Sequence, residues 1–177
     1  MYIQRTIEKS IDRANKFFPV VLVTGPRQVG KTTVLQNCET QPRTYVSLDT
    51  LENRELAKND PTLFLQRYPA PVLIDEIQYA PELFPYIKAS VDKEKKNGMY
   101  WLTGSQQFHL MKNVSESLAG RVGILQLEGL SQDEKNGHPD VPPFLPTEEY
   151  IKTKVQNATE TDLLKIYELI WKGSYPK

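Results

Sequence analysis

The segment Gly25-Pro26-Arg27-Gln28-Val29-Gly30-Lys31-Thr32 is a complete G-x-x-x-x-G-K-T pattern, and the fold prediction starts from it. It follows an apolar run over 20–24 that is typical of a buried strand. It leads into a helix-compatible stretch that continues to about residue 39. A strand, this loop and a helix are the setting in which the pattern binds phosphate. The alternative is a glycine-rich turn between a strand and a helix.

The residue types of this loop suit a triphosphate. Its glycines let backbone N–H groups turn inward and form a concave nest for phosphate oxygens, and the following helix adds the positive end of its dipole. Lys31 can reach the terminal phosphates, and the Thr32 hydroxyl can bind Mg²⁺. We therefore expect a nucleoside triphosphate with Mg²⁺ as the ligand, and both ATP and GTP fit these residue types. The candidate nucleotide-binding residues are Gly25, Pro26, Arg27, Gln28, Val29, Gly30, Lys31, Thr32 and Thr33.

A second motif, the apolar run over 72–74 that ends in Asp75 and Glu76, supports the first. Strands of a parallel sheet read as such runs, and ligands bind at the carboxyl ends of these strands. Asp75 is therefore predicted to lie beside the loop and to hold Mg²⁺ in the manner of a Walker B aspartate. Glu76 is placed to orient or deprotonate an attacking water. The alternative is two solvated acids that mark the end of a strand.

Composition narrows the class of protein. The 177 residues carry 22 basic and 22 acidic side chains, so the formal net charge is zero and gives no support to a nucleic-acid partner. Cys38 is the single cysteine, which excludes an internal disulfide and favours the reducing cytoplasm. No apolar stretch approaches the roughly 18 residues of a membrane helix, and the N-terminal segment lacks a signal-peptide core.

Strands and helices alternate along most of the chain, which predicts an α/β fold with a parallel sheet covered on both faces. Strands are expected at about 20–24, 43–48, 71–75, 99–103 and 122–127. Residues 131–146 are polar and rich in proline, so they are interpreted as a linker. Two helices are expected beyond it, at about 147–156 and 161–171, and the second has a broad apolar face.

Polar residues that follow the later strands are candidates for sensing the nucleotide. Thr103 and Ser105 close the fourth strand, where their hydroxyls can bond the terminal phosphate or the attacking water. Ser105 is equally consistent with an N-cap of the next helix. Arg121 opens the fifth strand and can stabilise charge on a transferring phosphate, in cis or in a neighbouring subunit. Its alternative is a pair with a surface acid.

Five segments together resemble one group of prokaryotic AAA-like P-loop ATPases that carry a second, C-terminal domain. The segments are GPRQVGKTT (25–33), YVSLD (45–49), VLIDEIQYAPELF (72–84), LTGSQQFHLMKNVSESLAGR (102–121) and ILQLEGLS (124–131). The resemblance implies a three-layer P-loop NTPase sandwich with strand order 5-1-4-3-2. It also implies that Ser105 and Arg121 match the sensor and arginine-finger positions, and that Asp75 and Glu76 match the Mg²⁺ and water positions.

Members of that group run to about twice this length, so the chain is expected to be a truncated N-terminal ATPase part. The expected division is an ATPase core over 1–130, a linker over 131–146 and the helical start of a C-terminal domain over 147–177. The missing part would carry the surface for an unknown protein partner. If Arg121 acts in trans, a homo-oligomer is required.

Four functions from different classes remain open at this point. The first is an ATPase whose motion drives or switches an attached domain, which the intact Glu76 favours. The second is a nucleotide-gated binding module with negligible hydrolysis, which the short chain favours. A small-molecule kinase is third, although the adjacent Asp75 and Glu76 favour attack by water. Action on nucleic acid is fourth, and no basic stripe supports it.

Overall fold

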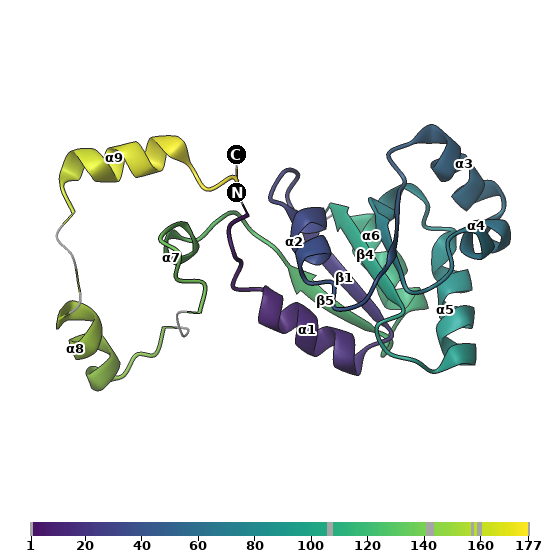
Figure 1. Cartoon of the computed structure of the whole chain (residues 1–177), viewed down its shortest axis with the longest axis horizontal. Coiled ribbons are helices and arrows are strands. Elements are labelled where there is room, and N and C mark those ends of the chain that lie inside the picture. Colours follow the sequence, from purple (N-terminus) through teal and green to yellow (C-terminus); the bar gives the residue numbers. More distant parts are fainter. Residues whose placement is uncertain (1, 106–107, 141–143, 157, 159–160, 177) are drawn as a thin grey trace.

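The computed structural model describes residues 2–105, 108–140, 144–156, 158 and 161–176, and Figure 1 shows a sheet flanked by helices. The five strands are parallel and follow the order β2-β3-β4-β1-β5. This is the predicted order 5-1-4-3-2 counted from the other edge, so the fold prediction is confirmed. The strands are β1 (Val20–Gly25), β2 (Thr44–Ser47), β3 (Val72–Asp75), β4 (Tyr100–Ser105) and β5 (Val122–Gln126).

The strand register brings the polar ends of the strands to one edge of the sheet. Gly25 at the end of β1 pairs with Ser105 at the end of β4. Ser47 at the end of β2 pairs with Asp75 at the end of β3. Because all strands run the same way, the phosphate-binding loop and the Asp75-Glu76 pair lie at the same edge, where α/β proteins bind ligands.

Helices cover both faces of the sheet because its inner strands are apolar on both sides. One face packs against α1 (Glu8–Phe17) and α2 (Lys31–Asn37), and its core includes Val21, Val23 and Trp101. The other face packs against a larger cluster that includes Val20 and Leu22. The elements on that side are α3 (Leu51–Asn59), α4 (Pro61–Arg67), the 3₁₀ turn η1 (Ile77–Tyr79), α5 (Leu83–Glu94) and α6 (Phe108–Ser117).

The region after β5 differs from the prediction in one respect. The expected linker contains a short helix, α7 (Gln132–Lys135), which is closed by a capping box between Ser131 and Glu134. The Ser-x-x-Glu spacing of that box is a local signal of a helix N-terminus, and the linker prediction rested on the prolines and polar residues alone. The loop prediction over 131–146 was therefore wrong for this one turn.

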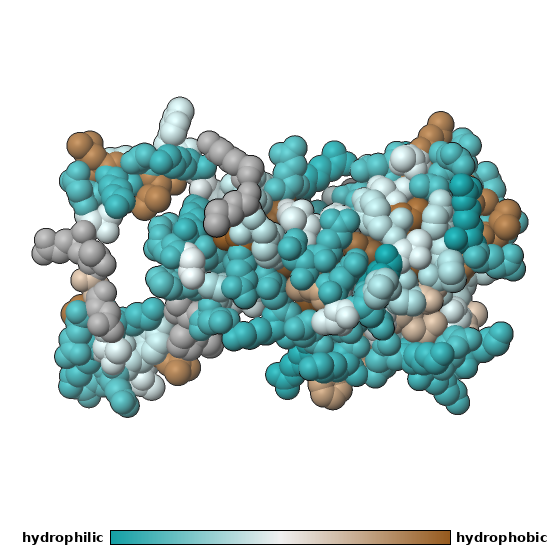
Figure 2. All heavy atoms as spheres, in the orientation of Figure 1, coloured by the Kyte–Doolittle hydropathy of each residue, from teal (hydrophilic) through white to brown (hydrophobic). Residues whose placement is uncertain are grey.

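Two more helices, α8 (Glu148–Gln156) and α9 (Leu163–Lys172), lie away from the sheet (Figure 1). Figure 2 shows apolar residues at the position of α9. Its exposed apolar side chains include Leu163, Leu164, Tyr167, Ile170 and Trp171. Within the described part of the chain, none of the helices is both long and apolar enough to cross a membrane. The predicted division at residues 130 and 146 stays a prediction.

Candidate nucleotide-binding site

The loop between β1 and α2 adopts a conformation that requires glycine at two positions. Gly25 has a φ of 151°, and a Cβ atom built on it would lie 2.0 Å from the backbone oxygen of Leu127. Gly30 has a φ of 90° and precedes α2. Gln28, at φ 64°, also lies in the left-handed region. Gly25 is therefore needed because the backbone of Leu127, the residue after β5, passes against it, whereas Gly30 is needed for its own backbone angle.

Lys31, the first residue of α2, turns back over the loop. Its Nζ donates hydrogen bonds to the carbonyl oxygens of Pro26, at 2.8 Å, and Gly25, at 3.3 Å. Burial lowers the pKa of the Lys31 ammonium below its usual value, while Glu76 and Asp75 act in the opposite direction. A buried cation whose nearest acceptors are two neutral carbonyls is well prepared to accept an anion.

Asp75, at the end of β3, collects three hydroxyl groups on one carboxylate. Its Oδ1 accepts hydrogen bonds from Thr32 at 2.6 Å and from Thr103 at 2.5 Å. Its Oδ2 accepts a bond from the Tyr45 hydroxyl at 3.3 Å, and burial together with this carboxylate raises the pKa of Tyr45. These contacts hold the Asp75 carboxylate in one orientation beside the first turn of α2. Tyr45 was not a predicted site residue.

Glu76 is the next residue, and its backbone turns away from the strand with φ 60° and ψ 46°. Its N–H donates to the Thr103 hydroxyl at 3.1 Å. Its side chain lines a hollow of about 270 Å³ together with Arg27, Gln28, Asp49 and Tyr79. The carboxylate thus borders open space next to the phosphate-binding loop, where a general base for water is needed.

Thr103 and Ser105 occupy different places from one another. Thr103 is fully buried, and its hydroxyl is engaged with Asp75 and with the backbone of Glu76. The Thr103 hydroxyl thus fixes the two acids, and its predicted bond to the terminal phosphate or the attacking water stays a prediction. Ser105 is half-buried, and its hydroxyl has no hydrogen-bond partner among the described residues. Its predicted contact with the nucleotide stays a prediction.

Arg121 lies at the amino ends of the strands, whereas the phosphate-binding loop lies at their carboxyl ends. The Arg121 backbone oxygen accepts a hydrogen bond from the N–H of Val20, the first residue of β1, and the loop follows Gly25, the last residue of β1. The length of β1, about 17 Å, separates the two ends. The guanidinium forms a two-pronged pair with Asp92, at 2.5 and 3.0 Å. The prediction that Arg121 acts in cis is therefore wrong, and the action in trans stays a prediction.

A second hollow, of about 370 Å³, lies on the other side of the loop. Its lining combines the loop with the two ends of the chain, which come close to each other (Figure 1). The lining residues are Tyr2, Ile3, Arg5, Gln28, Val29, Gly30, Thr33, Leu130 and Pro176. This hollow is mostly apolar and adjoins the phosphate-binding nest, which suits a nucleotide base. No pattern in the sequence indicated that Tyr2, Ile3 and Arg5 belong to the site.

Arg5 lines this hollow and contacts the phosphate-binding loop, the segment after β5 and α7. Its guanidinium donates to the Val29 oxygen of the loop at 2.9 Å and to the Glu128 oxygen after β5 at 2.8 Å. It also forms a buried ion pair with Glu134 of α7, at 3.1 Å. Burial alone would raise the pKa of Glu134, but bonds from the Ser131 and Thr6 N–H groups and the charge of Arg5 lower it.

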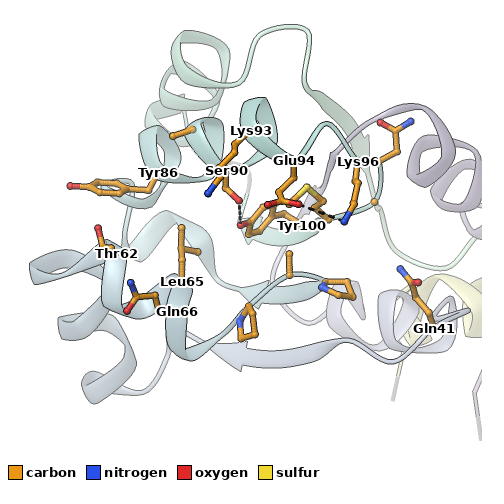
Figure 3. Close-up of a pocket in the computed structure, with 17 residues that line it drawn as sticks. Gln41, Thr62, Leu65, Gln66, Tyr86, Ser90, Lys93, Glu94, Lys96 and Tyr100 are labelled. Atoms are coloured by element: carbon orange, nitrogen blue, oxygen red, sulfur yellow. Dashed lines mark hydrogen bonds and ion pairs between the residues drawn. The ribbon is translucent and has the colours of Figure 1, made fainter.

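Figure 3 shows a larger hollow, of about 930 Å³, and none of its lining residues belongs to the phosphate-binding loop. It is lined by α4, α5 and the residues at the start of β4, which mark the opposite edge of the sheet. Its polar contacts include the Tyr100 hydroxyl bonded to Ser90 at 2.8 Å and the Lys96–Glu94 ion pair at 3.5 Å. Neither the loop nor the paired acids reach it, so its volume alone does not make it a triphosphate site.

The donor set near the loop fits a hard cation that arrives with a nucleotide. The Thr32 hydroxyl and the Asp75 carboxylate supply oxygen ligands, which Mg²⁺ prefers. Among the residues that the structure describes, no group of three or more His, Cys, Asp or Glu side chains could hold a metal ion by itself. Two protein oxygens with phosphates completing the shell are the usual arrangement for Mg²⁺ in such sites.

The parallel sheet, the glycine loop at the end of its central strand and the acid pair on β3 define a P-loop nucleotide-binding protein. The family model described as "AAA domain" matches residues 17–136. The chain therefore belongs to the AAA domain family, and it has the fold of an AAA-type P-loop ATPase.

Individual proteins are similar to this chain in sequence or in fold. The uncharacterized proteins Rv2008c of Mycobacterium tuberculosis and Mb2031c of Mycobacterium bovis are each 37% identical over 130 residues. Each match covers 72% of this chain and 29% of the relative, so the chain spans less than a third of the relatives it matches. The Walker-type ATPase PABY2304 of Pyrococcus abyssi shares the fold, with a TM-score of 0.56 and 19% identity over 87% of this chain and 63% of that one.

Proposed function

We propose that this chain binds ATP with Mg²⁺ and hydrolyses the bond between its β- and γ-phosphates. The observation that carries the proposal is the 2.6 Å contact between Thr32, at the start of α2, and Asp75, at the end of β3. It brings the two predicted magnesium ligands together, and Glu76 follows directly at the edge of an adjacent hollow. Family and fold support an ATPase in general; the roles of these residues are our proposal.

Each residue has one task in this scheme. Lys31 exchanges its bonds to the loop carbonyls for bonds to the terminal phosphates. Thr32 and Asp75 would hold Mg²⁺, which neutralises phosphate charge. Glu76 orients a water molecule and takes its proton as the water oxygen forms a bond to the γ-phosphorus. The bond from that phosphorus to the bridging oxygen breaks, and ADP leaves with the electron pair.

The 370 Å³ hollow lies where the base would follow the phosphates. We propose that the base packs between the N-terminal segment at Tyr2 and Ile3 and the C-terminal segment at Pro176. This lining is largely apolar, as the face of a purine requires. The relatives that match this chain are longer, and we propose that the region after β5 transmits the nucleotide state to a further domain.

Hydrolysis is proposed to need a second copy of the chain. Arg121 is at the far edge of its own sheet, so it can reach a transferring phosphate only in a neighbouring subunit. An arginine finger accelerates hydrolysis about 10³–10⁵-fold. Turnover per protomer should therefore rise with protein concentration, and Arg121→Ala should remove that rise.

The second candidate function is a nucleotide-gated binding module without turnover. The observation in its favour is the Asp92–Arg121 pair, which holds the predicted arginine finger away from the phosphate-binding edge. A chain that stays monomeric would then bind ATP and hydrolyse it negligibly.

The experiment compares Mg²⁺-dependent ATP binding and phosphate release for wild type, Lys31→Ala and Glu76→Gln. Lys58→Ala and Glu55→Gln are matched controls, since both side chains are exposed outside the site. Lys31→Ala should lose ATP binding, whereas Glu76→Gln should bind ATP and hydrolyse it about 10²–10⁴-fold more slowly than wild type. Binding without turnover at every protein concentration would favour the binding module, and binding that survives Lys31→Ala would overturn both functions.

A further inference from the structure

Gln78 connects the ends of two neighbouring strands at the proposed hydrolytic site. It lies in the middle of η1, two residues beyond Glu76. Its side-chain Nε2 donates a hydrogen bond to Glu76 Oε2. Its Oε1 accepts a bond from the backbone N–H of Ser105, at 3.3 Å. One amide group therefore joins the acid that follows β3 to the last residue of β4.

The surrounding backbone makes room for this bridge. Glu76 has a left-handed conformation and leads directly into the 3₁₀ turn, so the chain reverses and brings the side chain of residue 78 back beside residue 76. Gly104 leaves space for the amide, since a Cβ atom there would lie 3.0 Å from Gln78 Oε1 and 2.7 Å from a methyl group of Leu110. A side chain at position 104 would push against the bridge from the β4 side.

We propose that Gln78 is a positioning residue that sets the orientation of the Glu76 carboxylate for attack by water. This inference rests on the function proposed above. A carboxylate at the edge of an open hollow has freedom to rotate, and a fixed amide donor removes much of it. Since the same amide is anchored on Ser105, a movement of the end of β4 is passed to Glu76. The bridge thus makes hydrolysis depend on the arrangement of β4.

The simpler alternative is that Gln78 only closes the turn of η1. The two readings differ in what the loss of the side chain changes. A turn-closing role predicts lower thermal stability with no specific loss of turnover. A positioning role predicts a loss of kcat at unchanged ATP affinity, and that loss must disappear when Glu76 can no longer act as a base.

The test uses Gln78→Met, which keeps the length of the side chain and removes both hydrogen bonds. Gln66→Met, at an exposed site on α4, is the matched control. Gln78→Met should lower kcat about 10–100-fold with an unchanged Kd for ATP, because small misplacements of a catalytic group cost rates of this order. In a Glu76→Gln background, the same change should cause no further loss. An equal loss in both backgrounds would overturn the proposal.

A second measurement does not depend on turnover. In nucleotide-free protein, the side-chain NH₂ signals of Gln78 are identified by their disappearance in Gln78→Met. These protons should be protected from exchange with water in wild type and should lose that protection in Glu76→Ala. If the protons exchange at the same rate in wild type and in Glu76→Ala, the hydrogen bond between Gln78 and Glu76 does not exist and the proposal fails. If the bridge is present but wild type never hydrolyses ATP, the proposed function fails while the Gln78–Glu76 link stands.

Discussion

Replacing Arg5 by methionine is the most informative change to the scaffold of this site. Arg5 is 6% exposed, and its partner Glu134 is 5% exposed. Methionine keeps the apolar length of the side chain and removes every hydrogen bond that the guanidinium donates. It leaves the Glu134 carboxylate without a cation and leaves the Val29 and Glu128 oxygens without this donor.

The magnitude follows from burial. Breaking a buried ion pair by removing one partner costs about 3–5 kcal/mol. Glu134 keeps two hydrogen bonds from the backbone N–H groups of Thr6 and Ser131, so we expect the lower end of this range, about 3 kcal/mol. For a chain of this size, 1 kcal/mol shifts Tm by about 2–4 °C, so the Tm of Arg5→Met should fall by about 6–12 °C.

Thermal and urea unfolding followed by circular dichroism provide the measurement. The control is Arg67→Met, which breaks an exposed pair with Glu52 at 3.3 Å and should cost less than about 1 kcal/mol. The pKa of Glu134 is lowered in the folded state, so its ion pair with Arg5 stabilises the fold at pH values above the pKa of the unfolded state. This stabilisation disappears as pH falls through the pKa of the folded state. The difference in Tm between wild type and Arg5→Met should therefore become smaller in acid. A loss of stability in Arg5→Met no larger than that of Arg67→Met would mean that the buried ion pair contributes no more than an exposed one.

Three further outcomes are expected. Gly30→Ala should lower the free energy of unfolding by about 1–3 kcal/mol, because alanine is strained at the φ of this position. Gly25→Ala should lower it by about 1–3 kcal/mol more, because the new methyl group meets the Leu127 oxygen. Equal losses in thermal unfolding of the two variants would contradict this explanation. Burial lowers the pKa of Lys31, and bound phosphates would raise it, so the complex holds more protons than the free protein. ATP affinity should therefore fall as pH rises through the Lys31 pKa of the free protein. Calorimetric titrations with the same ATP affinity at neutral and alkaline pH would contradict this. Asp60→Ala removes the cap of α4 and should destabilise by about 1 kcal/mol in urea unfolding, whereas a neutral result would mean that the cap contributes nothing.

The link between the loop and the region after β5 has a physical basis in these contacts. Arg5 holds the Val29 oxygen of the loop and Glu134 of α7 with a single side chain. On the function proposed above, a nucleotide that moves the loop would act through Arg5 on the segment that leads to α8 and α9.

The sequence alone determined the phosphate-binding loop and the acid pair on β3, because both are carried by residues next to each other in the chain. An apolar run, a glycine at a fixed place and an acid at the end of a strand are local patterns. The order of the strands was also predicted, from the family resemblance of five segments, and the structure confirms it. Each of these features depends on residue type and short-range spacing.

The contacts between side chains across the site became known only from the packing of the elements in space. Arg5 meets Glu134 across 129 positions of the chain, and Tyr45 meets Asp75 across 30. The sequence also left Arg121 free to act in cis, although the direction of β5 carries it to the far edge, against Asp92. Such contacts follow from how helices and strands pack in space and from the direction in which each side chain leaves its element. Local residue patterns carry no record of that packing.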